Sequence, residues 1–182
     1  SSLACIPASA QGKAKLLVKD EGVIAGVAFA KQVFAYVDKD MKVETLIEDG
    51  SKVKYGDIAF YVEGASQSIL KAERLVLNAM QRMSAIATKT KKYVDLLEGT
   101  GTKILDTRKT TPGIRLFEKY AVCVGGGYNH RLDLFHGIML KDNHLVLINN
   151  LEQVLCNLKT QHPTKKIQIE IDYFNQLTQN IK

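Results

Sequence analysis

The sequence predicts a two-part fold that combines the α+β and α/β classes: a small N-terminal α+β domain with a mostly antiparallel sheet, then a parallel β/α barrel domain. Short strand-like segments separated by turns fill the first third of the chain, whereas strand-like and helix-like segments alternate after a long helical segment. Repeated β-then-α units form parallel sheets with right-handed crossovers. We place the domains at residues 1–84 and 85–182. We expect the barrel to be truncated at its C-terminus, because three such units are too few to close one.

The N-terminal domain is expected to contain short strands joined by turns, and one short helix. Apolar runs with period-2 alternation mark the strands, and clusters of Gly, Asp and Ser mark the turns. The expected elements are strands at 13–19, 41–47 and 57–62, a helix at 29–37, and turns at 22–26 and 48–51.

A long helix, whose beginning we assign to the N-terminal domain, is expected from Ser66 or Ser68 to Glu98. Either serine can serve as its N-cap, and Gly99 and Gly101 end it. Apolar residues recur along one side at Ile69, Val76, Met80, Met83, Ala87, Val94 and Leu97. The opposite side carries a basic stripe of Lys71, Arg74, Asn78, Gln81, Arg82, Lys89 and Lys92. From spacing alone, this stripe is expected to be a solvent-exposed face.

The remaining chain alternates between strands and helices. The expected strands are 103–105, 137–140 and 166–171, and the expected helices are 114–122, 151–158 and 174–181. Polar residues follow each strand at its C-terminal end, namely Thr107, Arg108 and Lys109, then Lys141 to His144, then Glu170 and Asp172. Active sites of β/α barrels lie at this end of the strands. We therefore expect these side chains to form the functional site.

The composition is that of a globular protein, with 46% hydrophobic and 24% charged residues, which excludes a disordered chain. No apolar run reaches the roughly 18 residues that span a bilayer, so we expect no membrane association. The cysteines Cys5, Cys123 and Cys156 have no metal-ligand spacing, and we interpret them as reduced thiols of a cytoplasmic protein.

The net charge of +6 is concentrated in the segment that carries the polar strand ends. Residues 70–145 contain 13 Lys or Arg against 7 Asp or Glu, whereas the rest of the chain contains 12 of each. A small anionic ligand explains this local surplus better than a nucleic acid does, because the aromatic and basic-run signatures of nucleic-acid binding are absent.

The segment Asp106–Gly113 places two cations and several hydroxyls between an expected strand and an expected helix. Hydroxyls and free amides at a helix N-terminus favour phosphate or carboxylate, although a polar connecting loop is the alternative. Gly125–Gly127 either allows a ligand to approach the backbone or forms an ordinary flexible turn. Arg131 offers a planar fork suited to a carboxylate, whereas the sequence assigns no acid–base role to His130.

Lys141 ends an apolar strand, where a cation needs a negative partner, and either a ligand or the adjacent Asp142 can supply it. Glu170 and Asp172 are expected to share one face by strand alternation. Carboxylates in a cationic pocket are expected to hold Mg²⁺ on a diphosphate or to stabilise a cationic transition state. The sequence contains neither a zinc-like ligand set nor an arguable Ser-His-Asp arrangement.

Four ordered motifs, spread along essentially the whole chain, resemble those of the quinolinate phosphoribosyltransferase family, also called nicotinate-nucleotide pyrophosphorylase (carboxylating). They are Glu73–Asn78, Asp106–Gly113, Lys119–Val122 with Gly125–Arg131, and Lys141–His144. The resemblance implies phosphoribosyl transfer from phosphoribosyl pyrophosphate to quinolinate, with Mg²⁺. The products would be nicotinate mononucleotide, CO₂ and pyrophosphate, in NAD biosynthesis.

The resemblance also implies which residues bind quinolinate. Arg108, Arg131 and Lys141 are expected to bind its two carboxylates, with Thr107 and His130 beside them.

For the second substrate, the resemblance implies that Lys109 contacts the phosphoribosyl donor, with Asn143 and His144 nearby. Glu170 is expected to act near the ribose and to contact the metal. Lys141 and Glu170 are the expected catalytic residues.

The implied assembly is a homodimer or larger homo-oligomer with a shared active site, which Arg74 reaches from the neighbouring subunit. Two parts of the family pattern are missing from the sequence: an upstream Gly-Asp-x-Thr segment with its leading helix, and the C-terminal portion. In the family, that portion carries a further strand-end Asp and the glycine-rich loops that hold the donor's 5′-phosphate. We therefore expect these residues to lack much of the donor half of the site.

Other functions stay open. A pyrophosphorylase-like paralogue of the same fold, such as those associated with molybdate transport, would act on another anionic substrate, and a catalytically incomplete fragment would act on none. Met41–Val43 and the turn at 49–57 suggest a biotinyl or lipoyl carrier, but Lys42 begins a strand instead of occupying a hairpin tip. A nucleic-acid-binding protein would show a steep salt dependence of binding.

Overall fold

The computed structural model describes residues 2–174 and 176, and the chain forms two compact units, Ser1–His130 and Arg131–Lys182. The division that the sequence predicts after residue 84 falls inside the longest helix. That helix packs against residues of the segment that follows it, so the first unit continues to His130. Each unit is described by itself below.

The first unit contains four helices and five strands within the described residues. The helices are α1 (Ser2–Cys5), α2 (Val27–Val37), α3 (Ser66–Leu96) and α4 (Arg115–Val124). The strands are β1 (Gln11–Leu17), β2 (Gly22–Val23), β3 (Lys42–Thr45), β4 (Lys52–Val53) and β5 (Ile58–Ala65). The main sheet has the order β1-β5-β3 and is antiparallel, as the sequence predicts, and β2 pairs with β4 in a second antiparallel ladder.

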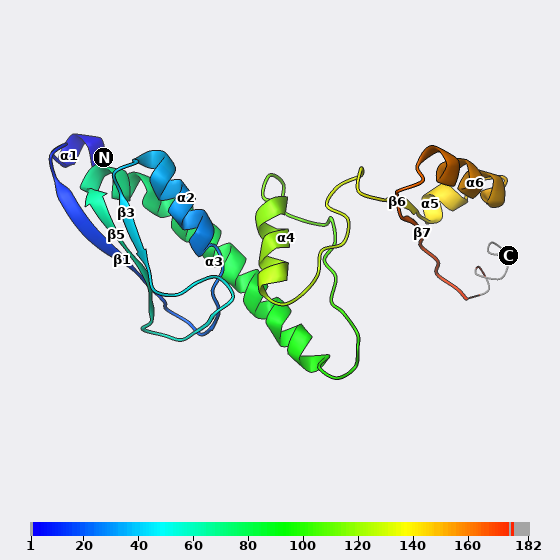
Figure 1. Cartoon of the computed structure of the whole chain (residues 1–182), viewed down its shortest axis with the longest axis horizontal. Helices are drawn as coiled ribbons and strands as arrows, with labels where there is room; N and C mark the ends of the chain where they lie inside the picture. The colour runs from blue at the N-terminus through cyan, green and yellow to red at the C-terminus, as the bar shows by residue number, and fades with distance from the viewer. Residues whose placement is uncertain (1, 175, 177–182) are drawn as a thin grey trace. The chain divides into compact units, whose positions relative to one another are not determined.

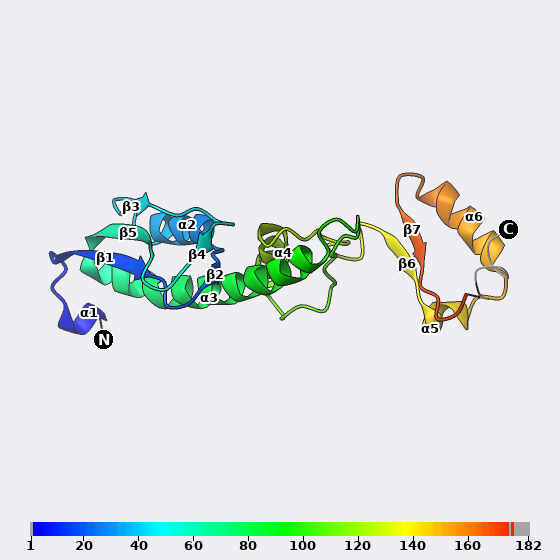
Figure 2. The ribbon, with the colours of Figure 1, turned by 90° about the horizontal axis from the view of Figure 1, so that it is seen from below.

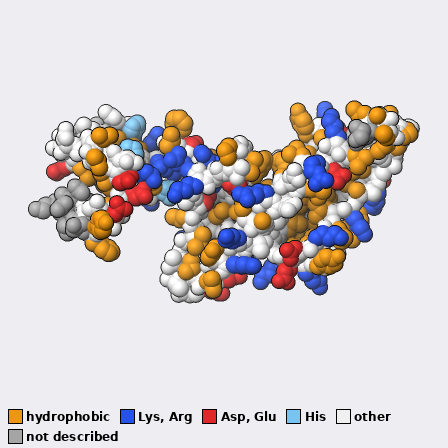
Figure 3. All heavy atoms as spheres, turned by 180° about the vertical axis from the view of Figure 1, so that it is seen from behind, with side chains coloured by type: hydrophobic (Ala, Val, Ile, Leu, Met, Phe, Trp, Pro, Cys, Tyr) orange, Lys and Arg blue, Asp and Glu red, His pale blue; other side chains and the backbone are white. Residues whose placement is uncertain are grey.

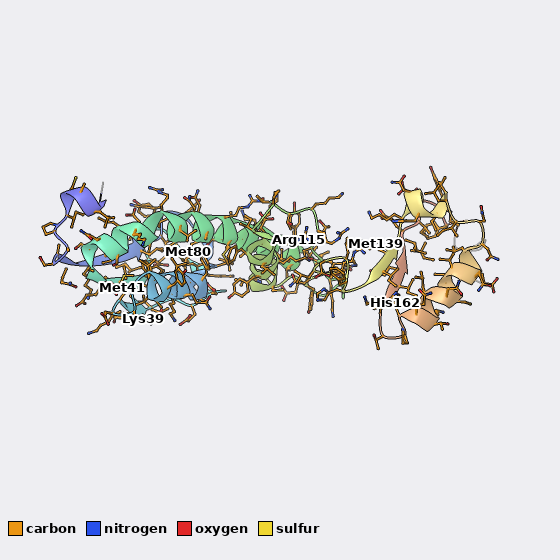
Figure 4. All side chains as sticks on the ribbon, turned by 90° about the horizontal axis from the view of Figure 1, so that it is seen from above. Lys39, Met41, Met80, Arg115, Met139 and His162 are labelled. Carbon is orange, nitrogen blue, oxygen red and sulfur yellow. The ribbon has the colours of Figure 1, made fainter. Side chains whose placement is uncertain are left out.

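Two helices pack against the main sheet and against each other. α3 contacts β1 and β5, α2 contacts β3, and α2 also contacts α3. The side chains between these elements form the larger core of the unit, which includes Val27, Phe34, Phe60, Val62, Val76 and Met80. Figures 1 and 2 show that α3 runs past the sheet and continues to α4. Met41 and Met80, which both belong to this core, are labelled in Figure 4.

The long helix α3 follows the predicted helical spacing. Ile69, Val76, Met80, Met83 and Ala87 are buried, and the predicted basic stripe is exposed, as the spacing indicates. Val94 and Leu97 are only half-buried, because they lie at the end of the helix beyond both core clusters.

The predicted N-cap of α3 is wrong. The cap residue is Ala65, with no side-chain hydrogen bond, and Ser66 is already the first helical residue. The last residue of β5 leads directly into α3, and the Ser66 N–H donates to Ala10 O at 2.9 Å.

A second core cluster joins α3 to α4 and to the segment 23–25, which begins with the last residue of β2. It contains Val23, Ala25, Met83, Ala87 and Ala121. The backbone of that segment is held by two hydroxyls one turn apart on α3. Val23 N donates to Thr88 Oγ1 (2.9 Å), and Ala25 N donates to Ser84 Oγ (3.0 Å).

The chain turns into α2 at Gly26, whose φ of +101° lies in the left-handed region that glycine adopts without strain. Asp49 then satisfies the first helical amide, because its Oδ1 accepts from Val27 N at 2.7 Å. Its Oδ2 accepts from the Tyr120 hydroxyl at 2.8 Å. Burial and this hydrogen bond raise the pKa of Tyr120 to about 12, so the phenol stays protonated and ties α4 to the turn before β4.

The prediction of a strand at 103–105 is wrong, because these residues form no full strand. Only Leu105 pairs, in an isolated parallel bridge with Tyr128, supported by the bonds from Tyr128 N to Ile104 O (2.9 Å) and from Asp106 N to Tyr128 O (3.1 Å). The partner segment begins directly after Gly125–Gly127, and glycine is a poor strand residue, so pairing stops after one bridge.

The second unit is a β-then-α arrangement with a parallel strand pair. Its elements are β6 (Ile138–Leu140), α5 (Asp142–Leu145), α6 (Leu151–Gln161) and β7 (Ile167–Ile169). β6 and β7 pair in parallel, with Leu140 opposite Ile169, as the predicted strand-helix alternation requires. β7 is shorter than the predicted 166–171. The helix predicted at 174–181 lies almost entirely outside the described residues, and the closed barrel stays a prediction.

Within the part of the chain that the structure describes, no helix is both long enough and apolar enough to cross a membrane.

Candidate functional site

The loop between Asp106 and Gly113 carries the first group of predicted site residues and lies in the first unit. Thr107 Oγ1 accepts from Lys109 N (3.1 Å), and Arg108 O accepts from Thr110 N (2.9 Å). These two local bonds curl the backbone around Arg108. Thr107 and Lys109 are exposed and Arg108 is half-buried, so all three side chains remain accessible to a ligand.

The far end of this loop is fixed by Glu118 of α4. Its Oε1 accepts from Arg82 Nε (2.9 Å), Arg82 Nη2 (2.8 Å) and Thr111 Oγ1 (2.8 Å), and its Oε2 accepts from Thr111 N (3.1 Å). Arg115 Nε also donates to Thr110 Oγ1 at 3.1 Å, and Figure 4 labels Arg115 at the start of α4. Charge-assisted bonds of this kind are stronger than neutral ones, so α3 and α4 together hold Thr110 and Thr111 in place.

Two opposing effects act on the pKa of Glu118. Burial raises the pKa, whereas the hydrogen bonds from Arg82 and Thr111 lower it and prevail, so the pKa lies below its usual value of 4.5. The carboxylate is therefore ionised at neutral pH.

Replacing Glu118 by glutamine is expected to remove an acid-sensitive contribution to stability. Because the folded pKa is lowered, the contribution is fully present above pH 4.5 and is lost as the pH falls through the folded value. Denaturant titrations at several pH values should therefore show the unfolding free energy of the unchanged chain falling more steeply with acid than that of Glu118→Gln. Glu98→Gln, at an exposed glutamate, is the control and should keep the steep fall. Parallel curves for Glu118→Gln and the unchanged chain would contradict this role.

The beginning of the loop is tied to α4 by a buried ion pair between Asp106 and Lys119. Asp106 Oδ1 also accepts from His130 N (2.8 Å), and Lys119 Nζ donates to His130 O (3.3 Å). Both the N–H and the carbonyl oxygen of His130 are therefore hydrogen-bonded, and His130 lies beside the loop that carries Thr107 and Arg108.

Arg74 lies on the exposed face of α3 and lines a groove of about 990 Å³ in the first unit. Apolar Leu77 and Met80 and the cations Lys89 and Lys92 also line it. Figure 3 shows Lys and Arg side chains along the surface of this unit, interspersed with exposed apolar ones.

Several predicted ligand-binding cations lack an acidic partner. Among the residues that the structure describes, no carboxylate oxygen lies within 4.0 Å of Arg74, Arg108, Lys109 or Arg131. Their charge is therefore available to neutralise an anionic ligand.

In the second unit the two expected catalytic residues lie together. Lys141 follows β6 and Glu170 follows β7, and Lys141 Nζ lies 2.9 Å from Glu170 Oε2. Glu170 N also donates to Leu140 O at 2.9 Å, which continues the parallel ladder by one bond. The partner of Lys141 is therefore Glu170 and not Asp142, the alternative that the sequence leaves open. β7 ends at Ile169, so the strand alternation predicted for Glu170 and Asp172 is wrong.

The remaining predicted residues of this unit flank Lys141. Arg131 Nη1 donates to Gly137 O at 3.2 Å, which holds one of the five guanidinium N–H groups. His144 Nδ1 accepts from Lys141 N at 2.9 Å across the start of α5. Asn143 and His144 are exposed.

A metal centre built by the protein alone is absent from the described residues, since no three His, Cys, Asp or Glu side chains gather there as possible ligands. Mg²⁺ is usually bound through one or two carboxylates, with substrate phosphates completing its coordination. Glu170 is half-exposed and follows a strand end, so its carboxylate suits this type of site.

Sequence reasoning missed the residues that support the loop. In α4, Glu118 and Lys119 are buried while Leu116 is 67% exposed, which reverses the usual amphipathic pattern. The pairing of Arg82 with Glu118 joins residues 36 positions apart, so spacing gives no sign of it. The available signal was that the adjacent Glu118 and Lys119 occur in a largely apolar helical segment.

Comparisons with known proteins match this chain to one family along its length. The family model described as quinolinate phosphoribosyl transferase, N-terminal domain, matches residues 1–84, and the model of the C-terminal domain matches residues 86–182. Quinolinate phosphoribosyltransferase (decarboxylating) 1b of Nicotiana tabacum is 43% identical over 169 residues, which cover 93% of this chain and 48% of that protein. The chloroplastic nicotinate-nucleotide pyrophosphorylase (carboxylating) of Oryza sativa subsp. japonica is 39% identical over 182 residues, which cover 100% of this chain and 48% of that protein.

Solved structures show the same likeness. The crystal structure of NadC from Streptococcus pyogenes superposes with a TM-score of 0.90 at 36% identity, over 98% of this chain and 64% of that one. The chain spans about half the length of the two plant relatives. Both family models together match nearly every residue, and the chain therefore belongs to the quinolinate phosphoribosyl transferase family.

Proposed function

We propose that the protein transfers the phosphoribosyl group of phosphoribosyl pyrophosphate to quinolinate and decarboxylates the product. The products would be nicotinate mononucleotide, CO₂ and pyrophosphate, and the reaction would serve NAD biosynthesis. The observation that carries this proposal is the match of both family domain models, at 1–84 and 86–182, to a chain in which the predicted site cations Arg74, Arg108, Lys109 and Arg131 lack acidic partners among the described residues.

Quinolinate is bound by its two carboxylates in this proposal. Arg108, Arg131 and Lys141 provide the positive charge in this proposal, with Thr107 and His130 as further binding residues. Guanidinium groups bind carboxylates through paired N–H donors, which selects a planar dicarboxylate over a monocarboxylate. The bond from Arg131 to Gly137 O and the curled loop around Arg108 support this role, because both limit the motion of the binding groups.

The phosphoribosyl donor is bound by Lys109, with Asn143 and His144 nearby. Glu170 would hold Mg²⁺ together with the pyrophosphate, and the metal would supply positive charge that stabilises the leaving group. Glu170 would also favour the positive charge that develops on the ribose, and Lys141, whose Nζ lies 2.9 Å from Glu170 Oε2, would fix the direction of this carboxylate.

The proposed chemistry needs no protein nucleophile. The ring nitrogen of quinolinate attacks C1 of the ribose, and the bond from C1 to the pyrophosphate oxygen breaks, with the electron pair leaving on pyrophosphate. The resulting pyridinium ring accepts the electron pair of the bond to the 2-carboxylate, CO₂ departs, and a proton takes its place on the ring. The protein contributes positioning and electrostatic stabilisation, which agrees with a site made of cations, hydroxyls and one carboxylate.

A homodimer or larger homo-oligomer with a shared active site is part of the proposal, with Arg74 acting on the neighbouring subunit. Arg74 has no acidic partner among the described residues and lines the 990 Å³ groove, which supports a role in contact with another molecule. We propose a cytoplasmic location and no nucleic-acid partner.

The test is a product assay on the intact protein with quinolinate, phosphoribosyl pyrophosphate and Mg²⁺. We expect nicotinate mononucleotide, pyrophosphate and CO₂ in equal amounts, and no product when nicotinate replaces quinolinate. Product formation from nicotinate at a similar rate, or none from quinolinate, would refute the assignment and favour a paralogue with another substrate. Mixing Arg74→Ala with a second inactive variant such as Glu170→Gln should restore part of the activity if the sites are shared between subunits.

A further inference from the structure

The Asp106–Lys119 ion pair is unusually well buried for two charged side chains. The side chain of Lys119 is 2% exposed and that of Asp106 is 7% exposed. Charged residues are rarely buried unless they are paired, and burying such a pair carries a desolvation cost that an apolar pair of similar size would avoid. A buried ion pair is therefore weak evidence for stability, and a role other than stability can explain why a pair occupies this position.

The pair lies where three segments of the first unit meet. Asp106 directly precedes Thr107 and Arg108, Lys119 belongs to α4, and both hold the backbone of His130 through the bonds at 2.8 Å and 3.3 Å. The Asn129 side chain adds to this cluster when its amide is oriented to satisfy its neighbours: its nitrogen then donates to Asp106 Oδ2 (2.6 Å) and Lys119 O (2.9 Å).

From this geometry we infer that Asp106 and Lys119 are positioning residues, which fix His130 relative to Thr107 and Arg108 in the orientation that binds quinolinate. The inference rests on the proposed function. Glu118 separately anchors Thr111, on the far side of Lys109. Loss of the Asp106–Lys119 pair should therefore disturb quinolinate binding more than donor binding.

The experiment compares Lys119→Met with the double variant Asp106→Leu/Lys119→Met in the intact protein. The single variant leaves a buried carboxylate without its partner and should lower the melting temperature strongly, whereas the apolar double variant should recover part of that loss. At a temperature where both are folded, the KM for quinolinate should stay raised by about tenfold or more in the double variant, with the KM for the donor changed by less than about twofold.

A purely structural role predicts a different outcome for the double variant. Its KM for quinolinate would return to the unchanged value together with the melting temperature, and the inference would be overturned. Lys91→Met is the matched control, because Lys91 pairs with Asp95 on the exposed surface of α3 and should leave both KM values unaltered.

Asn129→Ala keeps the experiment decisive if the double variant does not fold. Asn129 is exposed, so its replacement should lower the melting temperature much less than Lys119→Met does, while removing one hydrogen bond to Asp106. A raised KM for quinolinate in this variant would support the inference, and an unchanged one would overturn it. Absence of quinolinate turnover by the unchanged protein would instead refute the proposed function, and this inference with it.

Discussion

Replacing Arg131 by alanine is expected to weaken the binding of quinolinate by about 100-fold or more. Two charge-assisted hydrogen bonds between a guanidinium and a carboxylate contribute about 3 kcal/mol together, which corresponds to a factor of this size. Since Arg131 has no acidic partner among the described residues, its loss leaves no protein carboxylate without a counter-charge. Calorimetric titration of the intact protein with quinolinate, beside nicotinate, measures the effect directly.

Two further variants show whether the shape or only the charge of Arg131 matters. Arg131→Lys keeps the charge but loses the planar fork, so it should recover only part of the affinity. Lys159→Ala removes an exposed cation from α6 in the same unit and should change nothing. Equal binding of nicotinate and quinolinate, or unaltered quinolinate binding by Arg131→Ala, would contradict the assignment of a dicarboxylate site.

Replacing Gly125 by alanine is expected to destabilise the first unit by about 3 kcal/mol, at the upper end of the usual overpacking penalty. A Cβ atom on Gly125 would lie 2.5 Å from Ala87 O and 2.7 Å from Thr90 Cβ, both on α3. A backbone carbonyl in the middle of a helix cannot rotate aside, so α4 would have to move away from α3 and open the core around Ala121. The melting temperature should fall by roughly 6–12 °C, as expected for a chain of this size.

Gly99→Ala is the matched control for this prediction. Gly99 has a φ of +80°, but a Cβ there would meet nothing within 4 Å, so its replacement costs only the backbone strain of about 1–2 kcal/mol. Thermal unfolding of the two variants side by side separates close packing from conformational strain. A smaller loss for Gly125→Ala than for Gly99→Ala would contradict the close contact between α3 and α4.

The parts of the fold that periodicity governs were predictable from the sequence. The burial of Ile69 to Ala87 along α3 and the parallel pairing of β6 with β7 follow from spacing and from the order of the elements. The sequence could not show that residues 103–105 fail to form a full strand. Strand formation depends on a neighbouring segment, and here that segment pairs only through Tyr128.

The candidate site was likewise predictable only in part, because some of its contacts follow from the order of the strands and others depend on tertiary packing. The pairing of Lys141 with Glu170 agrees with the expectation that parallel strands bring their carboxyl ends together. The burial of Lys119 was hidden, because it depends on a carboxylate 13 positions earlier that meets it only after α4 has packed on α3. The ligand-binding roles of Arg108, Arg131 and Lys109 stay predictions until ligand binding is measured.

The hydrogen bond between His144 and the backbone of Lys141 determines which nitrogen of the imidazole ring can bind a ligand. Because Nδ1 accepts the Lys141 N–H, the hydrogen of the neutral ring must reside on Nε2. This tautomer offers outward a hydrogen-bond donor and no lone pair. His144 is therefore suited to recognise an anionic oxygen of a substrate and is unsuited to remove a proton from one.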